Sequence, residues 1–241
     1  NTHGSSTDFN GNNGMVVNGN FRGLEVSGNG QTTGNGGNFR FNDPNFIVFD
    51  HANINLDALV DGNGRFTGNG GSGEANSPLI FMNGSAISLN GNSGGSFVAN
   101  TGAFFSKDSS ITATGTDGAG GIIKINSSGP VDVDHGSLFD VSGKTIGSYD
   151  TNVIDITGSA VNVDGILKAD TTMGNGGRVM LTATGSNGEP QRVCIDCGID
   201  RANRLGALDD ASATRYHQVN AMLHQLDGDV IIGSPGQVSA N

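Results

Sequence analysis

The sequence predicts an all-β protein whose short parallel strands stack as a β-helix, a solenoid with about three strands in each coil. Three observations lead to this prediction. Glycine supplies 41 of the 241 residues, far above its usual share of roughly 7%. Short runs of alternating apolar and polar residues recur along the chain. The same order of strand and turn segments repeats, with glycine pairs between the repeats.

Glycine pairs mark the start of each repeat. They open the segments GGNFRF at Gly36, GGSFVAN at Gly94, GGIIKIN at Gly120 and GGRVMLT at Gly176. Three successive units, 97–121, 122–143 and 152–177, each hold three strand-like segments. Strands starting at Phe97, Ile122, Val153 and Val179 are 25, 31 and 26 residues apart. Equivalent strands are alike between units and unlike within a unit, which favours pairing between coils over hairpins. The chain has room for about eight such coils.

Alternation within the strands predicts which side chains face inward. The apolar residues expected inside include Ile123, Ile125, Val131, Val133, Val161 and Val163. Their polar neighbours are expected to point outward into water: Lys124, Asp132, Asp134, Asn162 and Asp164. Successive side chains of a strand point to opposite faces, so this assignment follows from strand geometry alone. Glycine and asparagine are expected at the corners, where the backbone takes positive φ.

The sequence divides the chain into four stretches. Residues 1–20 are expected to be a frayed or capping start of the solenoid, and residues 21–185 carry the β-helix repeats. Residues 186–227 break the pattern and are expected to form an insertion that contains a CxxC sequence and one helix. The helix is predicted from the apolar spacing of Tyr216, Val219, Met222, Leu223 and Leu226. Residues 228–241 resume a β-helix coil.

The charge of the chain limits its partners. The formal net charge is −11, and this argues against nucleic-acid binding, because a phosphate backbone selects clustered lysine and arginine. This net negative charge is compatible with secretion and with cation binding. No run of 18 apolar residues occurs, so no membrane span is expected. Because the chain starts at Asn1 without a methionine, we expect a processed product or an excised fragment.

The aspartates of the repeats are compatible with an alternative function, an enzyme that cleaves polysaccharides. A glycosidase needs two carboxyl groups about 5–10 Å apart, and six aspartates alternate with apolar residues: Asp132, Asp134, Asp140, Asp155, Asp164 and Asp170. Such residues are also the ordinary solvent face of an acidic strand, and lysines that would assist a lyase are scattered. We therefore predict no catalytic residue and no enzyme.

No cofactor and no metal site are predicted either. Loops rich in Asp, Asn and Gly offer oxygen ligands, so a bound Ca²⁺ remains an alternative to the absence of a cofactor. However, the sequence contains neither a tandem GGxGxD repeat nor an EF-hand loop. The five histidines, at His3, His51, His135, His217 and His224, lack the spacing of a zinc site.

Cys194 and Cys197 form the CxxC sequence. A zinc half-site would need two further ligands, and a redox CxxC would open a helix in a βαβ unit. A small disulfide that closes a tight loop is the interpretation we favour for an exported chain.

The segment GGIIKINSSGPVDVDHGSLFDVSG resembles the haemagglutination-activity repeats of filamentous-haemagglutinin-type exoproteins, which leave the cell by two-partner secretion. The GNGG sequences before FRF and RVML resemble the same repeats, and a CxxC outside the regular coils occurs in some members. The resemblance covers about residues 21–185 and 228–241. It implies a right-handed parallel β-helix, export through an outer-membrane pore partner, and adhesion. The family's NPNG-type secretion signature is not intact, since DPNFIVF at Asp43–Phe49 only partly matches it. We therefore interpret the chain as part of the shaft.

These observations predict a non-enzymatic adhesin shaft, secreted to a bacterial cell surface or extracellular matrix. By resemblance, its ligand is a host protein or a polysaccharide. The insertion is the predicted contact site, with Arg201, Arg204, Arg215, Tyr216 and His217 as candidate binding residues. Two alternatives remain: a filament subunit that self-associates through the ends of the β-helix or by strand donation, and a polysaccharide lyase or hydrolase of the β-helix type.

Overall fold

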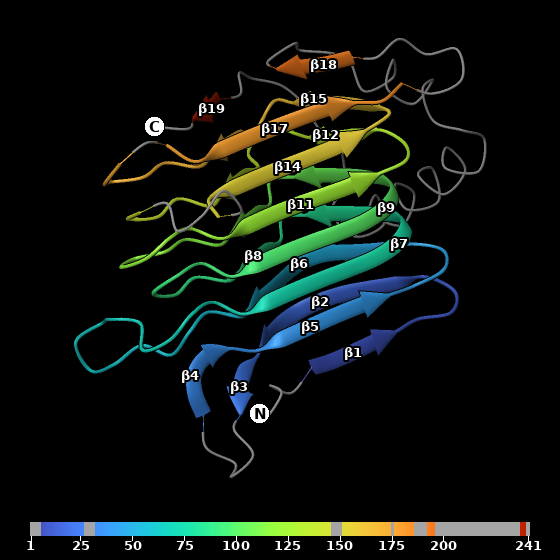
Figure 1. The fold of residues 1–241 in the computed structure, drawn as a ribbon. Coiled ribbons are helices and arrows are strands. Elements are labelled where there is room, and N and C mark those ends of the chain that lie inside the picture. The colour runs from blue at the N-terminus through green and yellow to red at the C-terminus, as the bar shows by residue number, and fades with distance from the viewer. Residues whose placement is uncertain are drawn as a thin grey trace.

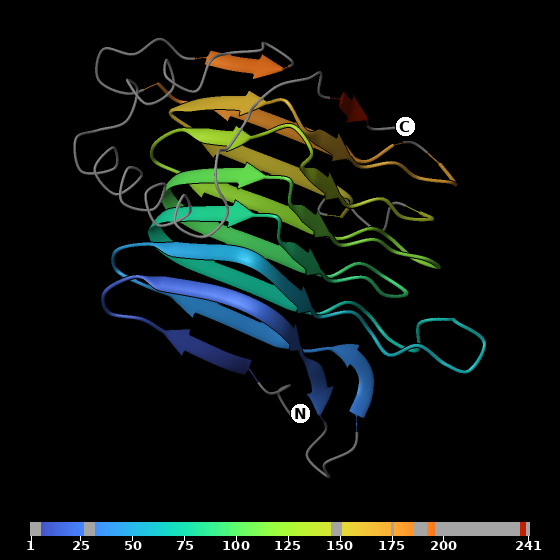
Figure 2. The same cartoon turned by 180° about the vertical axis from the view of Figure 1, so that it is seen from behind.

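The structure, a computed structural model, describes residues 6–26, 32–145, 151–174, 176–185, 192–195 and 237–239. These residues form a parallel β-solenoid of about six turns, which confirms the predicted fold class, and none of them is helical. Figure 1 shows the coils stacked along one axis, with β1 lowest and β17 near the top. The front strands run from left to right and the chain returns behind them as it climbs, so the coil is right-handed (Figures 1 and 2).

Three ladders of parallel strands, called faces 1, 2 and 3, form the walls of the solenoid, and strands that turn a corner join them into one sheet. Face 1 stacks β1 (Ser6–Asn10), β5 (Asn38–Asn42), the first halves of β7 (Ser72–Asn83) and β9 (Ser96–Lys107), β11 (Ile122–Ser127), β14 (Val153–Gly158) and β17 (Arg178–Ala183). Face 2 stacks the first halves of β2 (Met15–Arg22) and β6 (Ile47–Asn55), the second halves of β7 and β9, β12 (Val131–Val133), β15 (Ala160–Val163) and β18 (Arg192–Ile195). Face 3 stacks the second halves of β2 and β6, β8 (Ala86–Ser88), β10 (Ser110–Thr112), β13 (Leu138–Asp140), β16 (Ile166–Lys168) and β19 (Gln237–Ser239).

Strands near both ends of the described chain fall within the stretches that the sequence sets apart from the β-helix repeats, 1–20 and 186–227. The predicted boundary at residue 20 falls inside β2, and residues 6–20 already contribute to all three faces. A short antiparallel pair, β3 (Leu24–Val26) with β4 (Thr32–Gly36), lies outside the parallel stack. Within the predicted insertion, Arg192–Ile195 continue face 2 as β18. The helix expected in residues 186–227 lies outside the described residues.

The stacking keeps its register over coils of unequal length. Equivalent asparagines on face 1 are 32, 34, 24 and 26 residues apart in successive coils. The first coils are longer than the spacing near 25 residues read from the sequence, so the expectation of about eight coils is wrong. The in-register partner of Phe97 is Ile123, one residue later than the repeat alignment places it.

The core is a set of columns in which like residues stack on like. On face 3, one column runs through Ile54, Ile87, Ile111, Phe139 and Leu167, all at most 2% exposed. The inward residues predicted on faces 1 and 2 are buried as expected: Ile123, Ile125, Val131, Val133, Val161 and Val163. Full burial of one such side chain stabilises the fold by about 1.5–3 kcal/mol.

The outer side of face 2 differs from the prediction. Asp132 and Asp134 do point away from the core, yet they are only 5% and 3% exposed, and Asn162 and Asp164 are also buried. In the earlier coils the same outer side carries the apolar residues Val48, Leu79, Phe81, Ala103 and Phe105, which form a second hydrophobic cluster. Face 2 is therefore buried on both sides, and its acids do not face water. Alternation fixes the side to which a residue points, but burial depends on what covers that side.

The corner between faces 3 and 1, called the glycine corner, explains the glycine pairs. Here the chain leaves the wall in a loop and returns so closely that Gly95 N donates to Leu89 O at 2.8 Å, and Gly121 N to Ala113 O at 2.7 Å. A Cβ on Gly95 would lie 2.0 Å from the carbonyl oxygen of Gly71. Glycine is therefore required by close backbone contact. The loops of successive coils project together from this edge (Figures 1 and 2).

A ladder of buried serines forms the corner between faces 2 and 3. The hydroxyls of Ser85, Ser109 and Ser137 accept hydrogen bonds from the backbone N–H groups of Ala52, Ser85 and Ser109, at 3.0, 3.1 and 3.4 Å. The residue before each serine has positive φ: 55° at Gly84, 47° at Asp108 and 82° at Gly136. These corners coincide with the KDS and HGS turns expected from the sequence.

The glycine corner predicts that Gly95→Ala destabilises the solenoid by about 1–3 kcal/mol, the usual cost of overpacking, because the methyl group would meet backbone that cannot move alone. Gly62→Ala is the matched control, since a Cβ there meets nothing within 4 Å, and we expect unchanged or slightly higher stability. Urea unfolding followed by circular dichroism measures both. Equal unfolding midpoints for the two variants would contradict the steric explanation.

Candidate binding surface

The outer side of face 1 carries a continuous row of asparagines, called the asparagine ladder: Asn10, Asn42, Asn76, Asn100 and Asn126. Each side-chain Nδ2 donates to Oδ1 of the asparagine one coil before it. The four distances are 2.9, 2.8, 2.8 and 2.9 Å. Parallel in-register pairing places these residues one above another, so the hydrogen bonds run along the solenoid axis.

The ladder retains hydrogen-bonding capacity toward a ligand. An asparagine has two N–H donors and a carbonyl oxygen with two lone pairs. The ladder uses one donor and one lone pair at each inner position, while Asn76 uses its Nδ2 also toward Glu74 Oε1 at 3.0 Å. Asn100 is exposed, and Asn42, Asn76 and Asn126 are half-buried. The ladder therefore offers similar polar groups at every coil, about 4.8 Å apart along a straight line.

Next to the ladder lies a charged row with alternating signs, formed by Asp8, Arg40, Glu74, Lys124 and Asp155, with Val98 in the middle. Arg40 Nε donates to Glu74 Oε2 at 2.8 Å, and Lys124 Nζ lies 3.8 Å from Asp155 Oδ2. The hydrogen bond from Asn76 and the pairing with Arg40 lower the pKa of Glu74, and Glu74 raises the pKa of Arg40 in return. The row thus carries paired charges and little net charge.

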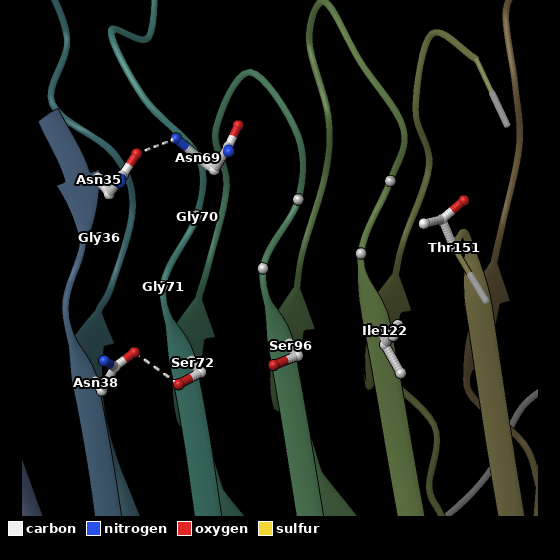
Figure 3. Close-up of a pocket in the computed structure, with 14 residues that line it drawn as sticks. Asn35, Gly36, Asn38, Asn69, Gly70, Gly71, Ser72, Ser96, Ile122 and Thr151 are labelled. Atoms are coloured by element: carbon white, nitrogen blue, oxygen red, sulfur yellow. Dashed lines mark hydrogen bonds between the residues drawn. The ribbon is translucent and has the colours of Figure 1, made fainter. Parts of the chain in front are cut away.

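A groove of about 360 Å³ runs across the coils between face 1 and the loops of the glycine corner. Its polar side chains are Asn35, Asn38, Asn69, Ser72, Ser96 and Thr151, and glycines of the corner and Ile122 complete it. Figure 3 shows the two hydrogen bonds that cross between its coils, from Asn69 N to Asn35 Oδ1 at 2.8 Å and from Ser72 Oγ to Asn38 Oδ1 at 2.6 Å. The groove lies at the start of the face 1 strands and the ladder four residues further along each coil, and both run along the solenoid axis.

The six aspartates considered for catalysis are distributed over all three faces. Asp132, Asp134 and Asp164 are buried on face 2 or at its end, and Asn162 Nδ2 donates to Asp132 Oδ1 at 3.1 Å and to Asp164 Oδ2 at 3.4 Å. Asp155 lies on face 1 beside Lys124. Asp140 and Asp170 lie at the end of face 3, where Lys168 Nζ is 3.6 Å from Asp140 Oδ2. The structure therefore spreads the six carboxylates over three faces and brings Asp132 and Asp164 together, around the shared donor Asn162.

The other predicted site residues fall largely outside the described residues. The backbone of Cys194 lies in β18, in register with Asn162 of β15. Cys197 and the candidate contact residues Arg201, Arg204, Arg215, Tyr216 and His217 are not among the described residues, so the disulfide and the contact site stay predictions. Within the described part of the chain, no group of three or more His, Cys, Asp or Glu residues is placed to hold a metal ion.

Sequence reasoning missed the asparagine ladder, although a signal for it exists. In four successive coils the glycine pair is followed by four residues and then asparagine: GGNFRFN, GGSGEAN, GGSFVAN and GGIIKIN. The glycines and the apolar alternation define the repeat, and turn chemistry alone explains an asparagine at the end of an expected strand. In the structure that position faces outward and stacks in register.

Comparison of the chain with family models, with curated proteins and with solved structures gives no match. The resemblance to two-partner exoproteins therefore depends on the residues quoted above and on the shared solenoid architecture. In the part of the chain that the structure describes, no helix has the length and apolar character needed to cross a membrane.

The charged row predicts a pH dependence of stability. The folded-state pKa of Glu74 lies below the ordinary value of 4.5, so its contribution is complete above that value and is lost as the pH falls through the lowered pKa. Between about pH 5 and pH 3, we expect the free energy of unfolding to fall less steeply in Glu74→Gln than in the parent protein. Asp117→Asn, which removes an acid from an exposed loop, is the control. Equal slopes for Glu74→Gln and the parent would refute this assignment.

Proposed function

We propose that this protein is an extracellular adhesin shaft that binds a neutral, extended polymer rich in hydroxyl groups along face 1. The observation that carries the proposal is the asparagine ladder, which presents amide donors and acceptors in a straight line over five coils. A polysaccharide presents hydroxyl groups along its length in the same manner. Many weak contacts made by one polymer on one rigid surface add up through effective concentration.

Charge supports a neutral ligand over an acidic one. The chain has a formal net charge of −11, which repels polyanions over the distance of a Debye length. Two cations of face 1 that would attract an anion are paired, Arg40 with Glu74 and Lys124 with Asp155, and a third, Arg178, is exposed in β17 at the end of the face. Uncharged hydroxyl groups need no such attraction and fit amide and serine partners.

Secretion and placement on a bacterial surface or in a matrix belong to the same proposal. They are supported by the acidic composition and by the resemblance of the repeats to two-partner exoproteins, which also implies a pore partner in the outer membrane.

Affinity electrophoresis in gels that contain a dissolved polymer tests the proposed binding. Dextran and galactomannan serve as neutral probes, and alginate and hyaluronan as acidic ones. We expect a neutral polymer to retard the protein, and the double variant Asn100→Ala/Asn126→Ala to lose most of this retardation, since it removes two successive members of the ladder.

The matched control is Ser88→Ala/Ser110→Ala, two half-buried outer positions in adjacent coils of face 3. We expect this variant to be retarded like the parent. The proposal fails if no neutral polymer retards the protein, if only acidic polymers do, or if both double variants behave alike while remaining folded.

A filament subunit is the second candidate, favoured by the lower end of the solenoid. Among the described strands, β1 pairs only with β5, so its other edge presents backbone donors and acceptors. The aromatic rings of Phe9, Phe21 and Phe39 lie near this end and are half-buried.

If this end adds a strand or a coil from another copy, the protein forms fibres as its concentration rises. Gly11 N donates to Asn42 O in the next coil, so by alternation the N–H of Asp8 in β1 faces the open edge. Replacement of Asp8 by proline, which removes this backbone donor, should then reduce fibre formation. Electron microscopy and sedimentation over a concentration series measure this. A protein that stays monomeric at high concentration excludes the filament.

A further inference from the structure

Asparagine followed by glycine is the sequence at which spontaneous deamidation is easiest, because glycine has no side chain to hinder attack by its own nitrogen. This chain contains the pair eleven times, and eight of these pairs lie in the described residues, starting at Asn10, Asn13, Asn18, Asn35, Asn63, Asn69, Asn83 and Asn90. The structure ranks these pairs by how firmly each glycine nitrogen is held.

The reaction has two steps. The backbone nitrogen of glycine attacks the side-chain carbonyl carbon of the preceding asparagine, the bond from that carbon to the amide nitrogen breaks, and ammonia leaves with the proton from the backbone nitrogen. Water then opens the cyclic imide on either side, giving aspartate or an isoaspartyl linkage. A glycine N–H that is held in a hydrogen bond must first be released.

The coils hold most of these nitrogens. Gly11, Gly36, Gly70, Gly84 and Gly91 each donate their backbone N–H to a carbonyl oxygen of the next coil at 2.8–3.1 Å. Gly14 donates to Asp43 Oδ2 at 3.1 Å. Release of any of these groups requires that one coil separate from its neighbour, and such opening is costly in the interior of a cooperative stack.

Several asparagine side chains are held as well. Asn35 Oδ1 accepts from Asn69 N, and Asn69 Oδ1 accepts from Ser93 N at 3.2 Å. Asn83 is buried and donates to Asp50 Oδ1 at 2.8 Å. Asn90 donates to Thr112 and accepts from Thr114. Rotation of these amides into the attack geometry would break contacts between coils.

Asn63–Gly64 is different. It forms the tip of a hairpin, 59–67, that projects from the glycine corner and whose arms meet at the bridge between Val60 and Phe66. The loop is visible at the lower left of Figure 1. The N–H of Gly64 donates at 3.1 Å to Asp61 O in the same turn, so its release disturbs no other coil. Both residues are exposed, and a Cβ on Gly64 would meet nothing within 4 Å.

From this contrast we infer that Asn63 is a built-in deamidation site, the first asparagine of the folded protein to convert to aspartate and isoaspartate. Asn18–Gly19 ranks second: it is exposed, but Gly19 is a strand residue in register with Ala52. The remaining six described pairs react only when coils open.

Conversion would alter the hairpin chemically. Asp61 already lies in this turn, where its carboxylate accepts from the N–H groups of Asn63 and Arg65 at 2.8 and 3.0 Å. A second carboxylate at position 63 would repel the first, and an isoaspartyl linkage would add a backbone atom to the turn. Either product loosens the loop that projects from the edge of the groove, without changing the coils beneath it.

Peptide mapping of the full chain tests the inference. The protein is held at about pH 8.5 and 37 °C, sampled over days and cleaved after arginine and lysine. The peptide that ends at Arg65 contains Asn63, and the next one, which ends at Lys107, contains Asn69, Asn83 and Asn90 as internal controls. Mass spectrometry counts the amide-to-acid conversions, and chromatography separates aspartyl from isoaspartyl forms.

We expect Asn63 to convert at least about tenfold faster than the three controls in the folded protein. In urea, where the coils are open, the difference should disappear, because all four sites share the Asn-Gly pair. The inference is wrong if Asn63 converts no faster than Asn69, Asn83 and Asn90 in the folded chain, or if its advantage persists in urea.

Discussion

The rest of this structure depends on one constraint: every coil hydrogen-bonds in register to the coil before it. Because β-strands in this arrangement lie about 4.8 Å apart, the path of the backbone in one coil dictates the path of the next. The glycine corner shows how strict this is, since a Cβ at Gly71, Gly95 or Gly121 would lie at most 2.0 Å from a carbonyl oxygen of the adjacent coil. Coils that differ in length place their extra residues in the loops outside this corner, as the hairpin 59–67 shows.

The same register arranges side chains into rows, inside and outside alike. Inside, it stacks Ile87 on Ile54 and Ile111 on Ile87, so a core only one side chain deep from each wall becomes continuous along the axis. At the serine corner it lines up hydroxyls that bond backbone groups of the adjacent coil. On face 1 it lines up the asparagines. The candidate binding surface therefore arises from the geometry that also makes the fold stable, and it grows longer with each coil.

The fold could be predicted from sequence because its signals are local. Glycine pairs and alternating strands identify the coil, and the inward residues follow from alternation. Exposure could not be predicted in this way. Asp132 and Asp134 point outward as expected but are buried, and the relevant signal was the apolar character of Val48, Phe81 and Phe105 at the same outer position of earlier coils. The asparagine ladder was missed for a related reason: a row of residues 24 to 34 positions apart becomes a surface only once the register is known.

Asn152 shows what the glycine corner requires. Register places it in the column of Gly37, Gly71, Gly95, Gly121 and Gly177, and it is the one non-glycine residue among the described members of that column. Its φ is 56°, a conformation that asparagine tolerates better than most residues. Its Oδ1 accepts from Gly120 N at 3.0 Å, whereas its buried Nδ2 has no hydrogen-bond partner. An orphaned buried amide group costs about 1–3 kcal/mol, which the bond to Gly120 offsets only in part. None of the five glycines in the column has a positive φ, so the corner requires glycine for close backbone contact and not for a left-handed backbone. Asn152 occupies the same place with a left-handed φ and a short side chain, and the solenoid continues there without glycine.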